Sequence, residues 1–413
     1  MKTTWQMPGY LIIPLKSTIM RFVNTLVYSA IAAIILASCQ KEKEQVAGNV
    51  NDGDNSVSKP SQKEEELLSG NGNNRGFVYT LSNQANGNKV ITYRRAANGS
   101  LTYIASFAAG GNGTGGGLGN QGAVVIADDG DVLLAVNAGS NTISSFKITG
   151  NGLNLKSTVS SGGTTPVSIA QHDDLVYVLN AGGTGNISGF KLGENDKLTP
   201  LSSSTRPLSS SMAGAAQVSF VRNGKVLVIT EKATNKIITY AVNESGRPGA
   251  MHSITAASPT TFCYASGRFG NIYVSEAVGG APNASNVSSY HINYNGSISL
   301  TQGPVPTGQS AACWVVLTEN GRYIYTTNTA SDNVSSYNVH PVSGHINILQ
   351  SIAATSAGAP IDAALTDNSK FLYILNAASH TITGYSVSAG GSLLALSGTI
   401  TGLPAGTNGL AAD

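Results

Sequence analysis

Residues 226–240 read VLVITEKATNKIITY. An apolar β-type run ends in Glu231, a short polar turn follows, and in the second run Ile237 is followed three positions later by Tyr240. Residues i and i+3 of a strand lie on opposite faces, so this second run carries a large apolar group on each face. Such a strand suits a sheet that is covered on both sides by neighbouring sheets.

The pairing of an aliphatic residue with an aromatic residue three positions later recurs along the chain. The pairs are Val90/Tyr93, Ile143/Phe146, Ile187/Phe190, Ile237/Tyr240, Val287/Tyr290, Val334/Tyr337 and Ile382/Tyr385. The aromatic residues follow one another at intervals of 53, 44, 50, 50, 47 and 48 residues. One four-stranded propeller blade has this period, so the sequence predicts an all-β fold, a seven-bladed β-propeller of four-stranded antiparallel blades.

A second repeat fixes the order of strands within a blade. Upstream of each pair, a strand ends in Asn or Glu, at Asn83, Asn137, Asn180, Glu231, Glu276, Asn328 and Asn376. Further upstream lies a hairpin marked by Gly or Asp, such as residues 319–322, preceded by an apolar run such as 314–317. Each repeat is therefore interpreted as an inner strand A, a hairpin, strand B, a short loop, strand C, a turn and an outer strand D.

The positions of the A strands predict how the ring closes. We place them near Ala123, Val167, Val218, Phe262, Val315, Ala363 and residues 409–411. The strand at 76–81 is a B strand with no A strand before it, so the C-terminal segment 404–413 should supply the missing inner strand. Residues 75–413 then provide about 48 residues for each of seven blades, in line with the repeat period.

The segment before the ring has the layout of a secretory signal. Arg21 precedes an apolar stretch at 26–36, and the tetrapeptide 36–39, Leu-Ala-Ser-Cys, resembles the lipobox of bacterial lipoproteins. We therefore expect a signal peptide over 1–38 with translation starting at Met20, lipidation at Cys39, and a polar disordered tether over 39–74. An N-terminal membrane helix is the alternative.

The expected location is the cell envelope, as a lipoprotein of the outer membrane. The charged run after Cys39 is either a surface-export signal or a solvated spacer.

Charge and cysteine content bound the partners. The formal charge of +2 becomes −1 when residues 1–38 are removed, because they contain three basic and no acidic residues. A near-neutral ring lacks the basic surface that binds nucleic acid, so we expect no nucleic-acid partner. No spacing of His or Cys residues indicates a zinc site, and we expect neither a metal nor a cofactor. Cys263 and Cys313 lie in adjacent A strands and form either a disulfide or two buried thiols.

Candidate site residues cluster where the B–C loops and D–A connections meet, around the mouth of the central channel. Five of the seven strand-B ends there are Asn, which caps its own turn, whereas two adjacent blades have Glu231 and Glu276. These two carboxylates are predicted as a catalytic acid and base, assisted by Lys232, or as ligands of a cation. The alternative is that they accept the same turn hydrogen bonds as Asn, or pair with Lys232 or Arg268. Predicted substrate-binding residues at the same rim are Gln217, Trp314 and Asp362.

Three segments resemble a known family. Residues 226–237, 312–316 and 404–412 look like the lactonase family of seven-bladed propellers, which includes 6-phosphogluconolactonase-like hydrolases and carboxymuconate cycloisomerases. The resemblance covers 76–413 and points to an exported lipoprotein branch. It implies hydrolysis or formation of a lactone ring, and the family's glutamate at the end of strand B in blade four matches Glu231. The family's His in the A strand of blade three is replaced by the segment 166–170, which contains no His.

Two functions of different classes follow. The first is an exported hydrolase of a sugar lactone or another small lactone, with Glu231 activating water or orienting the ring. The second is a non-catalytic propeller that presents its rim to a glycan or a protein partner. The sequence leaves open the substrate and the oligomeric state.

Overall fold

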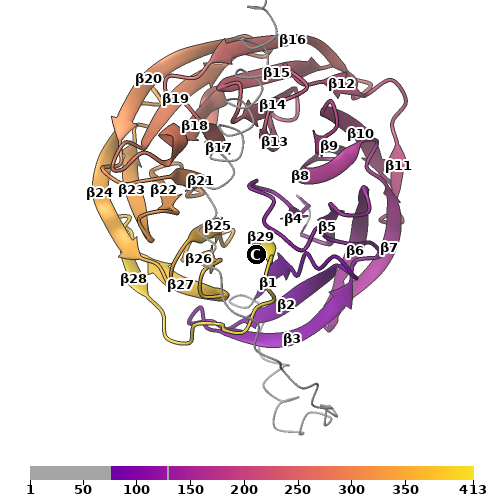
Figure 1. Cartoon of the computed structure of the whole chain (residues 1–413), viewed down its shortest axis with the longest axis horizontal. Coiled ribbons are helices and arrows are strands. Elements are labelled where there is room, and N and C mark those ends of the chain that lie inside the picture. Colours follow the sequence, from indigo (N-terminus) through magenta and orange to yellow (C-terminus); the bar gives the residue numbers. More distant parts are fainter. Residues whose placement is uncertain (1–75, 128–129) are drawn as a thin grey trace, which may run out of the picture.

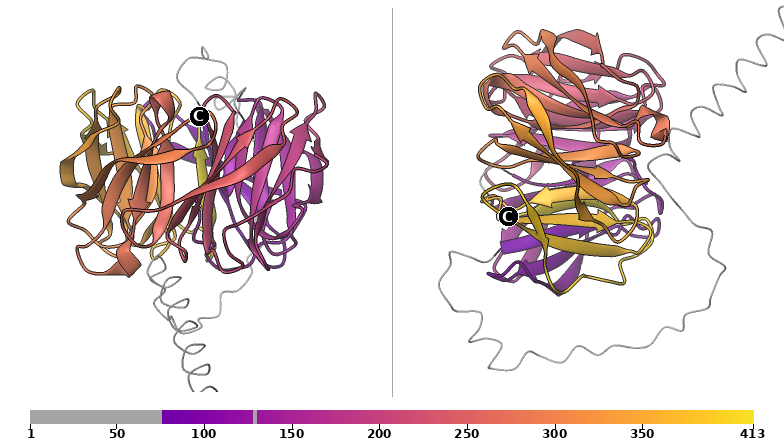
Figure 2. Two further views of the ribbon diagram at one scale, coloured as in Figure 1. Left: turned by 90° about the horizontal axis from the view of Figure 1, so that it is seen from above. Right: turned by 90° about the vertical axis from the view of Figure 1, so that its left-hand side faces the viewer.

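The computed structural model describes residues 76–127 and 130–413. Seven sheets are arranged around a central axis (Figure 1), and in the edge views the strands of the blades run across the thickness of the disc (Figure 2). The predicted all-β seven-bladed propeller is therefore confirmed. The predicted signal peptide, the lipidation site Cys39 and the tether lie outside the described residues. No helix in the described ranges is long and apolar enough to cross a membrane.

Each blade runs from an inner strand A to an outer strand D, and blade 1 is the one that contains both chain ends of the ring. The A strands of blades 1–7 are β29 (Asn408–Ala412), β4 (Val124–Ile126), β8 (Thr164–His172), β13 (Ala215–Val221), β17 (Thr261–Ser266), β21 (Ala312–Leu317) and β25 (Pro360–Leu365). The B strands are β1 (Gly76–Leu81), β5 (Val132–Asn137), β9 (Leu175–Gly182), β14 (Val226–Glu231), β18 (Asn271–Glu276), β22 (Tyr323–Asn328) and β26 (Phe371–Asn376).

The outer half of each blade completes the sheet. The C strands are β2 (Lys89–Arg95), β6 (Thr142–Thr149), β10 (Asn186–Leu192), β15 (Lys236–Val242), β19 (Asn286–Ile292), β23 (Asn333–Val339) and β27 (Thr381–Val387). The D strands are β3 (Leu101–Ala108), β7 (Gly152–Ser160), β16 (Pro248–Thr255), β20 (Ile298–Pro306), β24 (Ile346–Thr355) and β28 (Leu393–Ala395). In blade 3 the D strand is split into β11 (Leu198–Pro200) and β12 (Arg206–Pro207), both paired with β10. Two 3₁₀ turns, η1 (Arg268–Gly270) and η2 (Val278–Gly280), follow β17 and β18.

The repeated aliphatic and aromatic pairs form the packing between blades. All fourteen side chains are at most 4% exposed, which confirms that both faces of each C strand are covered. The tyrosines of these pairs also hold neighbouring blades together. The hydroxyl of Tyr337 donates to the carbonyl of Val305 at 3.2 Å, and the hydroxyls of Tyr240 and Tyr385 donate to carbonyls at the D-strand side of the preceding blades.

The ring closes within blade 1 as predicted. Strand β29 pairs antiparallel with β1, with Val78 opposite Ala412 and Tyr79 opposite Ala411. The hydroxyl of Thr80 donates to the carbonyl of Gly409 at 2.6 Å. The first and last strands of the ring are therefore held by one sheet, so the closure depends on the last residues of the chain.

Candidate functional site

The inner strands present a ring of repeat-equivalent side chains to the channel. In blades 3–7 the A strand has a bulge just after the residue that pairs with the Asn or Glu at the end of strand B. Two positions further along each of these A strands lies an equivalent residue. In blades 3 to 7 it is, in order, Ser168, Gln217, Cys263, Trp314 and Asp362. The three predicted substrate-binding residues thus occupy the same register position in blades 4, 6 and 7, and all are buried. Gln217 also ties two blades together, because its Oε1 accepts from the backbone N–H of Tyr264 at 2.7 Å.

Two aromatic rings pack against each other in this ring of residues. Phe262 and Trp314 have centroids 5.0 Å apart, with their planes inclined by 56°. The indole Nε1–H of Trp314 donates to the backbone carbonyl of Asn120 at 2.6 Å. Trp314 therefore combines an apolar wall with one hydrogen-bond donor that is aimed at a carbonyl oxygen.

Lys232 reaches the same place from the end of strand B in blade 4. The residue that follows the Asn or Glu of strand B is alanine in four other blades, at 138, 181, 277 and 377, so a lysine here departs from the repeat. Its Nζ donates to the carbonyl of Gly119 and lies 4.8 Å from the centre of the Phe262 ring. Burial lowers the pKa of Lys232 to about 8, and the neighbouring Cys263 acts in the opposite direction.

Cys263 and Asp362 complete the group around Lys232. Burial raises the pKa of the Cys263 thiol, while Lys232 lowers it and Asp362 raises it, so Cys263 lies within electrostatic reach of both charged groups. Burial also raises the pKa of Asp362, against the backbone N–H groups of Ala363 and Leu410, which stabilise the carboxylate. Cys263 is a free thiol, so it forms no disulfide with Cys313.

A glycine-rich segment from blade 1 to blade 2 fills the mouth of the channel. Figure 1 shows the chain between β3 and β4 running into the centre of the ring. Strand β4 has three residues, whereas the other A strands have five to nine. It is short because residues 119–122, which precede it, do not pair with β5 but cross the channel. The side chain of Gln121 exchanges two hydrogen bonds with the backbone of Val315 in blade 6, at 3.0 and 3.2 Å.

The predicted catalytic residue Glu231 is placed in the turns beside the channel. Its Oε1 accepts from the backbone N–H of Ser209 at 2.9 Å, and its Oε2 accepts from the hydroxyls of Ser209 and Thr234. Ser209 lies in the D–A connection that enters blade 4, and the carboxylate is fully buried. Glu231 therefore anchors this connection to the end of strand B.

Glu276 has the same role in blade 5. Its Oε1 accepts from the backbone N–H of Ser258 at 3.0 Å and from the hydroxyl of Tyr290 at 3.1 Å, and its Oε2 accepts from Ser288 at 2.7 Å. Burial raises its pKa, and these donors act against that change. At the equivalent position of blade 3 the polarity is reversed: Asn180 donates to the carbonyl of Ser161 at 3.1 Å. Glu231 thus binds donors from turns, whereas Glu276 binds one donor from a turn and two from strand β19.

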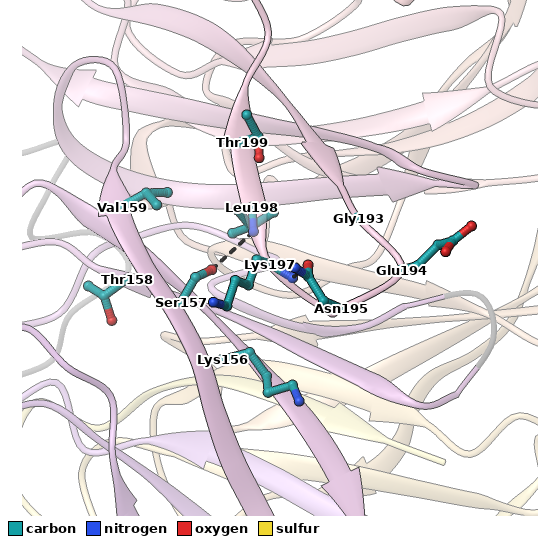
Figure 3. Close-up of a pocket in the computed structure, with 10 residues that line it drawn as sticks. All are labelled: Lys156, Ser157, Thr158, Val159, Gly193, Glu194, Asn195, Lys197, Leu198 and Thr199. Carbon is teal, nitrogen blue, oxygen red and sulfur yellow. Dashed lines mark hydrogen bonds between the residues drawn. The ribbon is translucent and has the colours of Figure 1, made fainter.

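A second hollow lies on the outer rim, away from the channel. Figure 3 shows it between β7 and the turn leading into β11, where the backbone N–H of Leu198 donates to the hydroxyl oxygen of Ser157 at 3.0 Å. The hollow encloses about 730 Å³ and is open to solvent; Lys156, Glu194 and Lys197 lie among its lining residues. None of the residues predicted for the channel mouth lies there.

Sequence reasoning does not identify three contributors to the channel site. The sequence marks Phe262 only as part of an A strand, and it marks Gly119 and Asn120 only as part of a glycine-rich connection. The signal that the sequence does contain is the lysine at a position where four blades have alanine. Within residues 76–127 and 130–413, no group of three or more His, Cys, Asp or Glu side chains is arranged to hold a metal ion.

Comparisons with known proteins agree with this architecture. A candidate 6-phosphogluconolactonase from Bacteroides fragilis superposes with a TM-score of 0.65 at 15% identity, over 86% of this chain and all of that chain. The periplasmic gluconolactonase of Pseudomonas aeruginosa superposes with a TM-score of 0.62 at 16% identity, over 81% of this chain and 98% of that chain. At these identities the likeness concerns the fold. No protein with a curated description matches the sequence.

The sequence itself matches a family described as "Lactonase, 7-bladed beta-propeller" over residues 71–210 and 284–407. The stretch between these ranges contains most of blades 4 and 5, with Glu231, Lys232, Cys263 and Glu276. The family match therefore does not include this part of the site. Since the match covers more than half of the chain and the structure has the seven blades that the family description names, the protein belongs to the lactonase family of seven-bladed β-propellers.

Proposed function

We propose that this protein hydrolyses a sugar lactone or another small lactone at the mouth of its central channel. The observation that carries the proposal is the placement of Lys232 and Trp314. Both are buried, both donate to carbonyl oxygens, and they enclose the Phe262 ring. Family membership and the Pseudomonas aeruginosa gluconolactonase with the same fold support the choice of a lactone as substrate.

Hydrolysis of a lactone requires stabilisation of the negative charge that develops on the carbonyl oxygen. Preorganised donors in a water-poor site perform this role, and their removal typically costs about 100-fold to 1,000-fold in rate. The Lys232 ammonium and the Trp314 Nε1–H are donors of this kind. Asp362, in its ionised form, accepts the proton of the attacking water and returns it to the ring oxygen as the C–O bond breaks.

In this proposal Glu231 and Glu276 position the site. Glu231 is adjacent to Lys232 in sequence and fixes the turn from which the lysine extends. The hydrogen-bond donors that contact Glu276 likewise belong to blade 5 and its turns. A direct catalytic role of Glu231 predicts a different response to mutation, and the two roles are separated by activity measurements on single variants.

The test is proton release from a panel of sugar and aromatic lactones, followed in a pH-stat. Lys232→Met is expected to lower turnover by about 100-fold or more. Glu231→Gln keeps the shape of the side chain and tests the general-base role, and Glu231→Asn restores the residue found in five other blades. Turnover that falls about 100-fold in Glu231→Gln but is unchanged in Lys232→Met would transfer catalysis to the glutamate. No turnover by the wild-type protein on any lactone would favour the non-catalytic binding propeller.

We further propose that the protein is anchored to the outer membrane through a lipid on Cys39. The order of Arg21, the apolar stretch and the lipobox supports this location. A propeller held at the envelope would meet lactones or glycans outside the cytoplasm.

A further inference from the structure

We propose that residues 119–121 occupy the channel site as an internal substitute for its ligand, and that they withdraw when a lactone or a hydroxy acid binds. This inference rests on the proposed function, because it assigns the ligand class to the same site. It adds that the structure represents a closed, self-occupied state.

The first observation is the chemistry of the contacts. Two successive backbone carbonyls, those of Gly119 and Asn120, accept hydrogen bonds from Lys232 and Trp314. These are the donors that a carboxyl group and a neighbouring oxygen of a lactone or hydroxy acid would use. The segment therefore places acceptor oxygens where a ligand of this class would place its own.

The second observation is that hydrogen bonds at two points hold the segment in place. Asn120 donates through its side chain to the carbonyl of Val167, and the carbonyl of Gly116 accepts from Asn83 Nδ2 at 2.6 Å. Gln121 bonds through its side chain to Val315 and through its backbone N–H to the carbonyl of Ala216 at 3.2 Å. Towards its other end, Gly113 donates to the carbonyl of Gln84 at 2.8 Å. Residues 112, 114 and 115, near this second point, are exposed, whereas Leu118 packs against two core clusters. Withdrawal therefore has to break these hydrogen bonds and release Leu118.

The third observation is the backbone at Gly119. Its φ is +58°, and a Cβ there would lie 3.1 Å from Lys232 Nζ. A side chain at this position would therefore both strain the backbone and press on the lysine. A Cβ added to Gly116, in the same segment, would meet no atom within 4 Å, so Gly116 offers a matched control.

Cys263 provides a reporter for opening. Its thiol is fully buried beside Lys232, so a small alkylating reagent reaches it only when the site opens. In the full-length protein, the rate of Cys263 alkylation by iodoacetamide is read by peptide mass spectrometry. Gln121→Ala removes two side-chain hydrogen bonds and is expected to raise this rate about tenfold or more. Gly119→Ala should raise it as well, whereas Gly116→Ala should match the wild type.

Hydrogen exchange distinguishes local opening from unfolding. Gln121→Ala is expected to speed amide exchange in residues 112–122 and to leave the amides of β22 unchanged. Equal acceleration in both regions, or no faster alkylation in either Gln121→Ala or Gly119→Ala, overturns the proposal. Gluconate, which has a carboxylate and a neighbouring hydroxyl, should speed exchange in residues 112–122 of the wild type; unchanged or slower exchange there overturns the displacement step.

Lactone turnover separates this inference from the proposed function. Faster Cys263 alkylation in Gln121→Ala, without lactone turnover by any variant, supports the self-occupied site and refutes the hydrolase. Turnover by the wild type, with no opening in Gln121→Ala or Gly119→Ala, supports the hydrolase and refutes the withdrawal of residues 119–121.

Discussion

Replacing Lys232 with methionine should change the pH dependence of stability in a defined direction. The ordinary pKa of a lysine is 10.5, and burial lowers that of Lys232 to about 8 in the folded protein. Between these values the unfolded chain binds more protons than the folded protein, so the free energy of unfolding rises with pH. The charged lysine therefore destabilises the fold most below about pH 8, and this penalty disappears as the pH approaches the pKa of the unfolded chain.

The magnitude follows from the difference between the two pKa values. A difference of about 2.5 corresponds to about 3 kcal/mol over the whole range, at roughly 1.4 kcal/mol for each pH unit. From about pH 7 to about pH 9.5, the unfolding free energy of the wild type should rise by about 2 kcal/mol relative to Lys232→Met. The buried tyrosines are common to both proteins, so their titration cancels in this difference.

Urea denaturation across this pH range measures the difference. Lys197→Met, which removes an exposed lysine, controls for the loss of one positive charge. If the wild type and Lys232→Met keep a constant difference in unfolding free energy from about pH 7 to about pH 9.5, the assignment of a desolvated, titrating Lys232 is refuted.

Three further predictions concern closure, the turns and the membrane anchor. Deleting residues 408–413 removes the partner of β1 and should lower the melting temperature measured by circular dichroism; an unchanged melting temperature would contradict closure by β29. Glu276→Gln turns an amide N–H₂ towards donors in the turn at Ser258 and in β19, and should lower the unfolding free energy in urea by about 1–3 kcal/mol. The exposed Glu244→Gln is the control, and equal stability would mean that those hydrogen bonds contribute nothing. Cys39→Ser should move the protein from the membrane fraction to the soluble fraction or block signal processing, and an intact mass with an unmodified N-terminus other than Cys39 would rule out lipidation.

The repeated parts of this structure can be predicted because the same physical requirement recurs in every blade. Ile237 and Tyr240 must each fill the space against a neighbouring blade, and six other pairs do the same, so their spacing indicates the fold. Closure by residues 408–412 is predictable because a B strand without a partner starts the ring and an A strand without a partner ends it.

The channel site can be predicted only in part, because its contacts are not periodic. Gln217, Trp314 and Asp362 are recognisable from their place in the A strands. The contact of Trp314 with the carbonyl of Asn120 joins residues 194 positions apart and uses a backbone atom, which no sequence pattern marks. The turn contacts of Glu231 depend on Ser209, in a connection whose path the sequence does not define.

The most direct test of the proposed function is the pH dependence of kcat/KM for lactone hydrolysis by the wild-type protein, after subtraction of the spontaneous reaction. If the Lys232 ammonium stabilises the developing oxyanion, activity is present below its pKa of about 8 and is lost above it, by about tenfold per pH unit. The same profile measured with Lys232→Met should lack this descending limb. A wild-type kcat/KM that stays constant or rises from about pH 7 to about pH 9.5 would contradict the proposal.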